Sequence, residues 1–267
     1  AGDHAHYLES INYTYNDMSP INEYKVNSDS QLHCAERIRS RKKYQKLDQL
    51  QISPDVLENN INNNILKNFD KDIYKEIFEF NQYTNKVKIN NKDTVLDLGC
   101  SKGYLYFKCL LENLDVNYIG VDASVFNIQD FTENLYDDFN PILLNLAVDN
   151  KLKVIDFDCM FHIGSHQIIP TITFPNLLNL INKPIDFLKF DIEGYEKYIF
   201  EDYELFKSKI NKFAGEIHFK SDIFLKKDVY SLLEKFKQDP DIEFTLFSID
   251  MVDVTDMVWS IEDYYNE

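Results

Sequence analysis

The chain has 267 residues, of which 44% are hydrophobic and 27% charged, and its formal net charge is −17. This length suffices for one large α/β domain with an extension. The acidic balance argues against nucleic acid as the main partner, because nucleic-acid binding needs clustered Lys and Arg. The four cysteines include no C-x-x-C pair, which favours a reduced, cytoplasmic protein over a zinc ribbon or a thioredoxin. No apolar run reaches the roughly 20 residues of a membrane span.

The first third of the chain has the pattern of a helical extension. Its polar start, which carries Asp3 and Glu9, differs from a secretory signal. Residues 31–50 are predicted to form a helix with a basic face, which either holds an anionic substrate group or is simply solvated. Apolar residues at spacings of three and four predict another helix over residues 65–80. We therefore expect residues 1–93 to form a mainly helical extension. Its first 30 residues, which show no clear period, form either a loosely ordered arm or a lid or homodimer contact.

A strand, a glycine turn and a helix start follow at residues 93–103, which read D-T-V-L-D-L-G-C-S-K-G. Gly99 and Gly103 bracket the turn, where glycine lets the backbone approach a ligand and the helix start offers unpaired N–H groups. The middle glycine of the dinucleotide fingerprint G-x-G-x-x-G is missing. The carboxylate of Asp97 would repel a phosphate and attract the ammonium group of S-adenosylmethionine (SAM). The turn therefore favours a SAM-dependent methyltransferase over a dehydrogenase.

Strands and helices alternate from this turn onward, which is typical of a mostly parallel sheet. The expected strands cover residues 94–98, 118–121, 142–148, 185–190, 213–219 and 243–249, with a last short one at 258–261. The expected helices cover residues 104–111, 124–136, 173–181, 196–206 and 228–237. Residues 153–157 and 159–163 are expected to form a hairpin insertion. We predict an α/β fold with a Rossmann-like, doubly wound sheet in a domain that spans residues 94–267.

Acidic residues end several of the predicted strands, at the edge where doubly wound sheets bind ligands. Asp122 lies 25 residues after Asp97, close to the offset of about 20 residues at which nucleotide folds place a ribose-binding acid. A carboxylate there accepts both ribose hydroxyls. The alternative is that Asp122 caps the helix that begins near Ser124.

The later strand ends supply candidates for chemistry on an acceptor. His218 titrates near neutrality and follows a strand that ends at this edge, so it is the first choice as general base for a hydroxyl, with Asp191 or Glu193 second. A hydrogen-bonded structural histidine is the alternative for His218. Asp191, Glu193, Glu216 and His218 also offer donor atoms for Mg²⁺, and the sequence leaves the metal unassigned.

Six segments in this part of the chain resemble one known family. They read V-L-D-L-G-C-S-K-G, Y-I-G-V-D-A-S, L-L-N-L-A-V, T-I-T-F-P-N-L-L, D-F-L-K-F-D-I-E-G-Y-E and E-I-H. In this order they are similar to the FkbM family of SAM-dependent O-methyltransferases, over about residues 94–220 and most specifically at 188–196. The resemblance implies a class I methyltransferase-like fold. The chain departs from the family at Cys100-Ser101, in place of Ala-Asn, and at Asp122-Ala123, in place of Glu-Pro.

The resemblance also implies roles for matching positions. The residues implied to bind SAM are Asp97, Gly99, Cys100, Ser101 and Gly103 around the methionine part, Asp122 and Ala123 at the ribose, and Asn145 and Ala147 near the adenine. Asp191 and Glu193 would face the methyl group and the acceptor. The implied reaction is methyl transfer to a hydroxyl of a sugar, either a nucleotide-linked sugar or a component of a surface polysaccharide. An NAD-dependent oxidoreductase and a non-catalytic SAM-binding scaffold stay open as alternatives.

Overall fold

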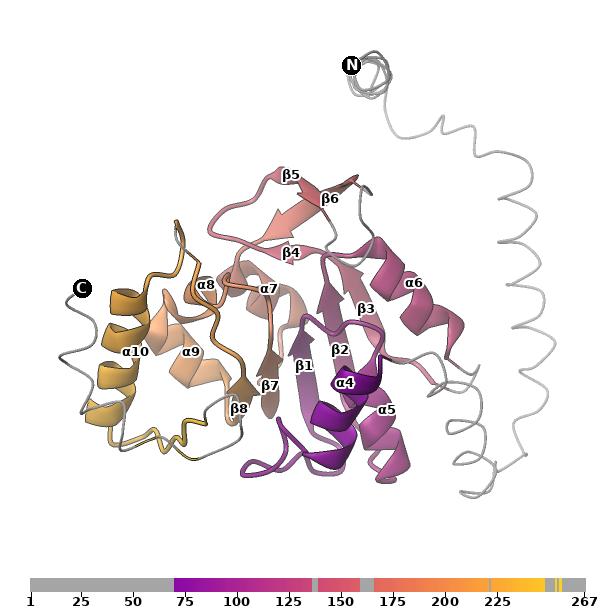
Figure 1. The fold of residues 1–267 in the computed structure, drawn as a ribbon, viewed down its shortest axis with the longest axis horizontal. Helices are drawn as coiled ribbons and strands as arrows, with labels where there is room; N and C mark the ends of the chain where they lie inside the picture. The colour runs from indigo at the N-terminus through magenta and orange to yellow at the C-terminus, as the bar shows by residue number, and fades with distance from the viewer. Residues whose placement is uncertain are drawn as a thin grey trace, which may run out of the picture. The chain divides into compact units, whose positions relative to one another are not determined.

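The computed structural model describes residues 70–135, 139–158, 166–220, 222–247, 253 and 255. The predictions for residues 1–69, 159–163 and 258–261 lie outside these ranges. The described part begins with helix α4 (Lys71–Tyr74), which continues as one turn of π-helix, η4 (Lys75–Glu79) (Figure 1). The carboxylate of Asp70 caps α4 by accepting from the backbone N–H groups of Asp72 and Ile73. These two elements agree with the second half of the predicted helix over residues 65–80.

Five parallel strands form the main sheet, in the order β3-β2-β1-β7-β8. They are β1 (Thr94–Leu98), β2 (Asn117–Asp122), β3 (Ile142–Asn145), β7 (Phe187–Phe190) and β8 (Phe213–Gly215). The chain proceeds from β1 outward to β3 and then crosses to β7 on the other side of β1. The strand order therefore reverses between β1 and β7, which is the point where doubly wound sheets bind ligands. This arrangement confirms the predicted fold class.

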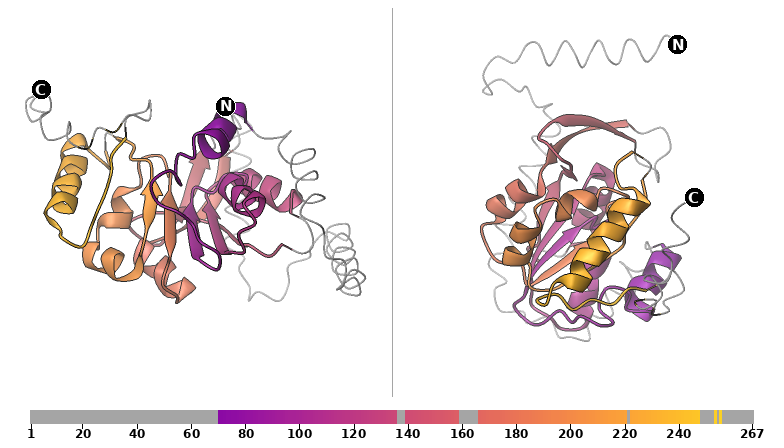
Figure 2. Two further views of the ribbon diagram at one scale, coloured as in Figure 1. Left: turned by 90° about the horizontal axis from the view of Figure 1, so that it is seen from below. Right: turned by 90° about the vertical axis from the view of Figure 1, so that its left-hand side faces the viewer.

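Helices cover both faces of the main sheet, as the two views in Figure 2 show. On one face lie η4, α5 (Tyr104–Leu111) and α6 (Val125–Glu133), and on the other lie α7 (Phe174–Ile181), α8 (Lys197–Phe200), α9 (Tyr203–Lys209) and α10 (Lys226–Gln238). Each face has its own hydrophobic core. Val95 of β1 packs in the first core, whereas Leu96 and Leu98 pack in the second. Burial on both faces explains why the strands are nearly continuous runs of apolar residues.

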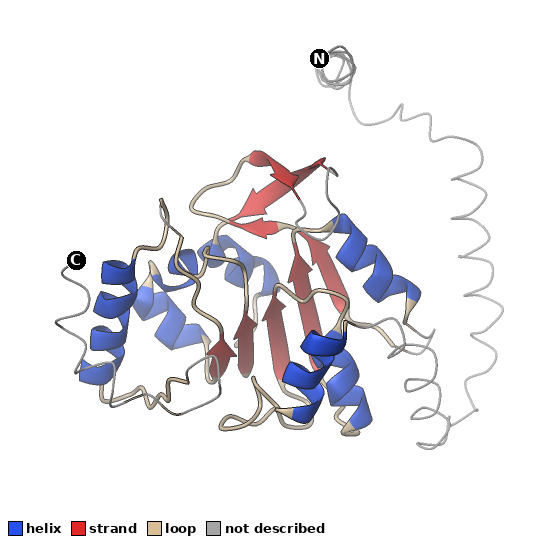
Figure 3. Ribbon diagram, in the orientation of Figure 1, coloured by secondary structure: helices blue, strands red, loops and turns tan. Residues whose placement is uncertain are grey.

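A small second sheet lies beyond the carboxyl ends of the main strands (Figure 3). Its order is β4-β6-β5, with β4 (Ala147–Val148) parallel and β5 (Val154–Asp158) antiparallel to β6 (His166–Ile172). The predicted strand over residues 142–148 is therefore two strands in different sheets. They separate at Leu146, whose N–H donates to the carbonyl oxygen of Asp122 at 3.1 Å. The first strand of the predicted hairpin insertion is present as β5, and it pairs antiparallel with β6; the predicted second strand lies outside the described residues.

Three further predictions need correction. The predicted helix over residues 196–206 is two helices, because Asp202 interrupts it and caps α9 by accepting from the N–H of Leu205. The strand predicted over 213–219 ends at Gly215, so Glu216 and His218 lie in the segment that follows it. The described part of residues 243–249 contains only a single bridge, between Phe247 and Asp253. No helix within the described ranges is long and apolar enough to cross a membrane.

Candidate functional site

The glycine turn after β1 packs tightly between the ends of β2 and β7. Gly99 and Gly103 adopt left-handed conformations, with φ of 75° and 85°. A Cβ atom on Gly99 would overlap the backbone carbonyl oxygen of Asp191, so only glycine allows the turn to approach β7 this closely. On the other side, the N–H groups of Gly99 and Cys100 both donate to the carbonyl oxygen of Val121, at 2.8 and 3.1 Å. The turn is thus fixed at the switch point of the sheet.

Asp122 organises the loops next to this turn. Its side chain is buried, and it accepts hydrogen bonds from the N–H groups of Ser101 at 2.8 Å and Ser124 at 2.7 Å. Burial raises the pKa of the Asp122 carboxyl, and these hydrogen bonds oppose the increase. The side-chain amide of Asn145 donates to the carbonyl oxygens of Asp122 and Ala123. The structure thus brings four predicted cofactor-binding residues together, while Ala147 begins β4 of the small sheet.

Lys189 is a central residue that the sequence analysis missed. It lies on β7 directly opposite Asp97 of β1, and both side chains are buried. Its Nζ atom lies 3.2 Å from Asp97 Oδ1 and 3.8 Å from Asp191 Oδ2, and it donates to the carbonyl oxygen of Gly99 at 2.6 Å. Burial lowers the pKa of Lys189, but the two carboxylates outweigh this effect and raise it. A lysine inside the apolar run F-L-K-F was the available signal.

The position of Asp97 bears on its predicted contact with the cofactor. Only 1% of Asp97 is exposed, and its other oxygen, Oδ2, accepts from the hydroxyl of Tyr118. Because Lys189 and Tyr118 both engage this carboxylate, Asp97 acts on the glycine turn through Lys189. This arrangement disfavours direct contact between the Asp97 carboxylate and the ammonium group of SAM.

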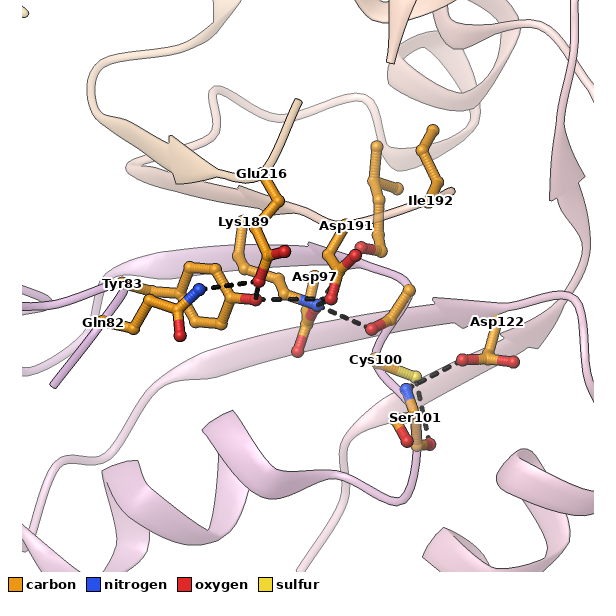
Figure 4. A network of polar contacts seen from close by, with 12 residues as sticks. Gln82, Tyr83, Asp97, Cys100, Ser101, Asp122, Lys189, Asp191, Ile192 and Glu216 are labelled. Carbon is orange, nitrogen blue, oxygen red and sulfur yellow. Dashed lines mark hydrogen bonds and ion pairs between the residues drawn. The ribbon is translucent and has the colours of Figure 1, made fainter. Parts of the chain in front are cut away.

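Asp191 and Glu216 meet at the carboxyl ends of β7 and β8, where Tyr83 joins them (Figure 4). The Tyr83 hydroxyl donates to Glu216 Oε1 at 2.7 Å and lies 3.3 Å from Asp191 Oδ2. The side-chain amide of Gln82 also donates to Glu216 Oε1, at 2.7 Å. Tyr83 and Gln82 belong to the loop after η4, inside the predicted extension. No local pattern marks them, since their role depends on contacts more than 100 residues away in the chain.

His218 lies between two glutamates. Its Nδ1 atom is 3.1 Å from Oε1 of the fully buried Glu196, and its Nε2 atom is 3.4 Å from Glu216 Oε2. These contacts raise the pKa of His218 to about 10, and the hydrogen bond from His218 lowers the pKa of Glu216 to about 2. Both ring nitrogens of His218 therefore carry a proton at neutral pH, and the imidazole is positively charged. This state argues against the predicted role of His218 as a general base, which requires a free nitrogen lone pair.

The two other predicted catalytic residues are adjacent to this ion pair. Burial raises the pKa of Asp191; Lys189 lowers it and Glu216 raises it further. Asp191, Glu193 and His218 are the one group within the described residues whose donor atoms approach a metal-binding arrangement, all lying within 4.8 Å of one another. The carboxylates suit Mg²⁺, but Nε2 of His218 must first lose its proton. The donor set therefore fits Mg²⁺ only in part.

Replacing Lys189 by Met should strongly destabilise the protein. The substitution leaves Asp97 as a buried carboxylate without a cation, which costs about 3–5 kcal/mol in comparable pairs. Urea unfolding of the wild type and the variant measures the change. The double variant Asp97→Asn/Lys189→Met removes both charges and should recover much of the loss, whereas equal instability of the single and double variants would contradict the ion-pair explanation.

The stabilisation that His218 contributes should depend on pH. Its pKa in the folded protein is about 10, above the value of 6.5 that a free histidine has. The contribution is therefore complete below pH 6.5 and is lost as pH rises through about 10. Urea unfolding of the wild type and His218→Gln between pH 6 and 10 should show a stability difference that shrinks with increasing pH. An NMR titration that gives His218 an ordinary pKa would refute this account.

One family model and two solved structures are similar to this chain. The family model described as Methyltransferase FkbM domain matches residues 72–246, more than half of the chain. Two solved structures show weak similarity to this chain. One is a precorrin 8W decarboxylase of Methanobacterium thermoautotrophicum, with 14% identity and a TM-score of 0.33, over 63% of this chain and 71% of that one. The other is the plantazolicin methyltransferase BpumL, solved with a pentazolic desmethylPZN analog and SAH, with 12% identity and a TM-score of 0.26, over 76% of this chain and 59% of that one. A search of curated proteins found no match.

The family match spans every part of the site described above. It includes the glycine turn, Asp122, the segment around Lys189 and Asp191, and the segment that carries Glu216 and His218. It also begins before Tyr83, so it covers the loop that the sequence resemblance left out. The resemblance is therefore confirmed, and the chain belongs to the FkbM methyltransferase family.

Proposed function

We propose that this protein is a SAM-dependent O-methyltransferase that methylates a hydroxyl group of a sugar. One observation carries the proposal: carboxylates outnumber cationic groups at the switch point of the sheet. Among the described residues, five acids lie around the cations Lys189 and His218; the acids are Asp97, Asp191, Glu193, Glu196 and Glu216. Lys220 adds one further cation, whose Nζ lies 3.5 Å from the carbonyl oxygen of Glu193, so the acids still outnumber the cations. An excess of negative charge complements a sulfonium and an ammonium group. It opposes the diphosphate of NAD, which disfavours the oxidoreductase alternative.

The residues around the turn and along the neighbouring strands are proposed to bind each part of SAM. The turn between Gly99 and Gly103 offers its backbone to the methionine part. Asp122 is the proposed ribose ligand, since it lies at the end of β2 beside the turn and its carboxylate retains acceptor capacity beyond the hydrogen bonds it already accepts. Asn145, at the end of β3, and Ala147, at the start of β4 in the small sheet, are proposed to lie near the adenine. When bound, SAM supplies a methyl group on a sulfonium whose departure as a neutral thioether is easy.

The remaining task of the protein is to align the acceptor hydroxyl and to remove its proton. Alignment contributes about 7 kcal/mol or more in well-held cases. Asp191 is the proposed proton acceptor, because it lies at the carboxyl end of β7 beside the glycine turn and burial raises the pKa of its carboxyl, which makes it a stronger base. Tyr83 and Lys189 hold the Asp191 carboxylate in position. His218 is then a positioning residue that holds Glu216.

The acceptor edge suits a sugar hydroxyl. Asp191, Glu193 and Glu216 supply carboxylate oxygens, and Gln82 and Tyr83 add an amide and a phenol. Such a set offers acceptors and donors for several neighbouring hydroxyls. The proposal includes nucleotide-linked sugars and components of surface polysaccharides. The basic run at residues 37–46, which suggested an anionic carrier, lies outside the described residues.

Replacing Asp122 by Asn should weaken SAM binding. The amide keeps the shape of the side chain but lacks the charge, and its NH₂ group accepts no hydrogen bond from a ribose hydroxyl. Hydrogen bonds to charged groups contribute about 1.5–3 kcal/mol, so the dissociation constant should rise about 10-fold to 100-fold. Calorimetric titration with SAM, with NAD as comparison, measures the effect. Glu133→Gln, at an exposed position of α6, is the matched control and should bind SAM like the wild type.

Replacing Asp191 by Asn should abolish methyl transfer while SAM still binds. Loss of a general base typically lowers kcat by about 10²-fold to 10⁴-fold. The assay follows formation of S-adenosylhomocysteine with a panel of neutral, amine-bearing and phosphate-bearing sugars. It is run with and without EDTA, because Asp191, Glu193 and His218 form the group that could hold Mg²⁺. Activity that survives EDTA assigns the proton transfer to Asp191 without a metal.

Two outcomes would overturn the proposal. Binding of NAD in preference to SAM would favour the oxidoreductase. SAM binding without S-adenosylhomocysteine formation, for every acceptor in the panel, would favour a non-catalytic scaffold.

A further inference from the structure

We infer that a cavity beside α7 and α8 is a binding subsite for a saccharide unit that carries an amine and no negative charge. The cavity has a volume of about 440 Å³ and is lined by Asp149, Thr173, Phe174, Tyr198, Glu201 and Asp202, among others. None of these residues takes part in the site described above. The inference rests on the proposed function, because it assigns to the same enzyme a second contact with its acceptor.

The lining comes from three segments of the fold. Asp149 follows β4, Thr173 and Phe174 begin α7, and Tyr198 and Glu201 belong to α8 and its C-terminal end. Helix α8 starts six residues after Asp191, so one short segment runs from the proposed base to the wall of the cavity. Figure 1 shows α7 and α8 next to each other beyond β7. The proposed base and one wall of the cavity therefore belong to the same short segment of the chain.

The walls combine an apolar floor with a polar rim. Phe174 is buried and Pro175 is half-buried beside it, and Tyr198 adds a partly exposed ring. Burial and the charge of Asp149 raise the pKa of the Tyr198 hydroxyl, which therefore stays a hydrogen-bond donor. Small-molecule sites in proteins combine such apolar surfaces with a few convergent polar groups. An aromatic ring with carboxylates around it also suits an ammonium group.

The charge of the rim selects against anions. Asp149 is neutralised by Lys153, at 2.7 Å. Asp202 accepts a hydrogen bond from the N–H of Leu205 and has no cationic partner among the described residues. The exposed side chain of Glu201 has neither an ion pair nor a hydrogen bond to any described residue. Two carboxylates are thus uncompensated at the cavity, so it should attract an ammonium group and repel a phosphate or a uronate.

Binding of three monosaccharides tests the inference directly. Glucosamine, glucose and glucuronate differ mainly in charge, and each is titrated into the ¹⁵N-labelled protein while shifts of Tyr198 and its neighbours are followed. We expect glucosamine to bind best and glucuronate not to bind. Glu201→Gln should weaken glucosamine binding about threefold to fivefold and leave glucose unaffected. Glu204→Gln, an equally exposed change three residues along the chain, is the matched control and should change neither.

Three results would overturn the inference: glucuronate binding as well as glucosamine, shifts that avoid the cavity, or equal effects of Glu201→Gln and Glu204→Gln. Failure of the proposed function has a different signature, since it appears in the titration with SAM. Monosaccharide binding is measured without SAM. Normal SAM binding together with absent glucosamine binding would therefore remove only the subsite.

Discussion

A buried lysine joins the ends of the two central strands, and the site is built around it. Lys189 lies opposite Asp97 in register, inside a sheet covered on both faces. Two buried charges are costly to remove from water, and they are tolerated because each has the other as partner together with further hydrogen bonds. The same ammonium group donates to the carbonyl oxygen of Gly99. One interaction thus connects β1, β7 and the turn that is proposed to hold the cofactor.

A second ionic group sets the protonation states next to the proposed reaction centre. The buried Glu196 accepts from the N–H groups of Ile192 and Gly194 and also contacts His218. His218 in turn lowers the pKa of Glu216. Asp191 differs from Glu216, since burial raises the pKa of the Asp191 carboxyl. When the pKa values of two neighbouring carboxyls shift in opposite directions, one commonly has a structural role and the other an acid–base role.

Much of the fold followed from local pattern, whereas the site depended on pairings that no local pattern contains. Apolar runs and glycines predicted β1, the turn and α5, and Thr173 marked the start of α7. The local pattern did not show that the chain leaves the main sheet at Leu146 or that β8 ends at Gly215. Both features depend on contacts with neighbouring strands. Lys189 meets Asp97 through the register of β1 and β7. The charge of His218 was hidden for the same reason, since it is set by glutamates that are distant in the sequence or on another element.

The edge strands of the two sheets differ in length and in exposed apolar side chains, which affects how readily copies of the protein pair at their edges. In the main sheet, β3 and β8 have only four and three residues, and short edge strands offer little backbone for another chain to pair with. In the small sheet, β5 is an edge strand of five residues that carries the exposed Val154, and Ile168 lies exposed on β6 beside it. Asp156, between these apolar positions, places a charge on the same strand. Within the described residues, the small sheet therefore combines an edge strand with exposed apolar side chains, and the charge of Asp156 opposes the pairing of this edge with another copy.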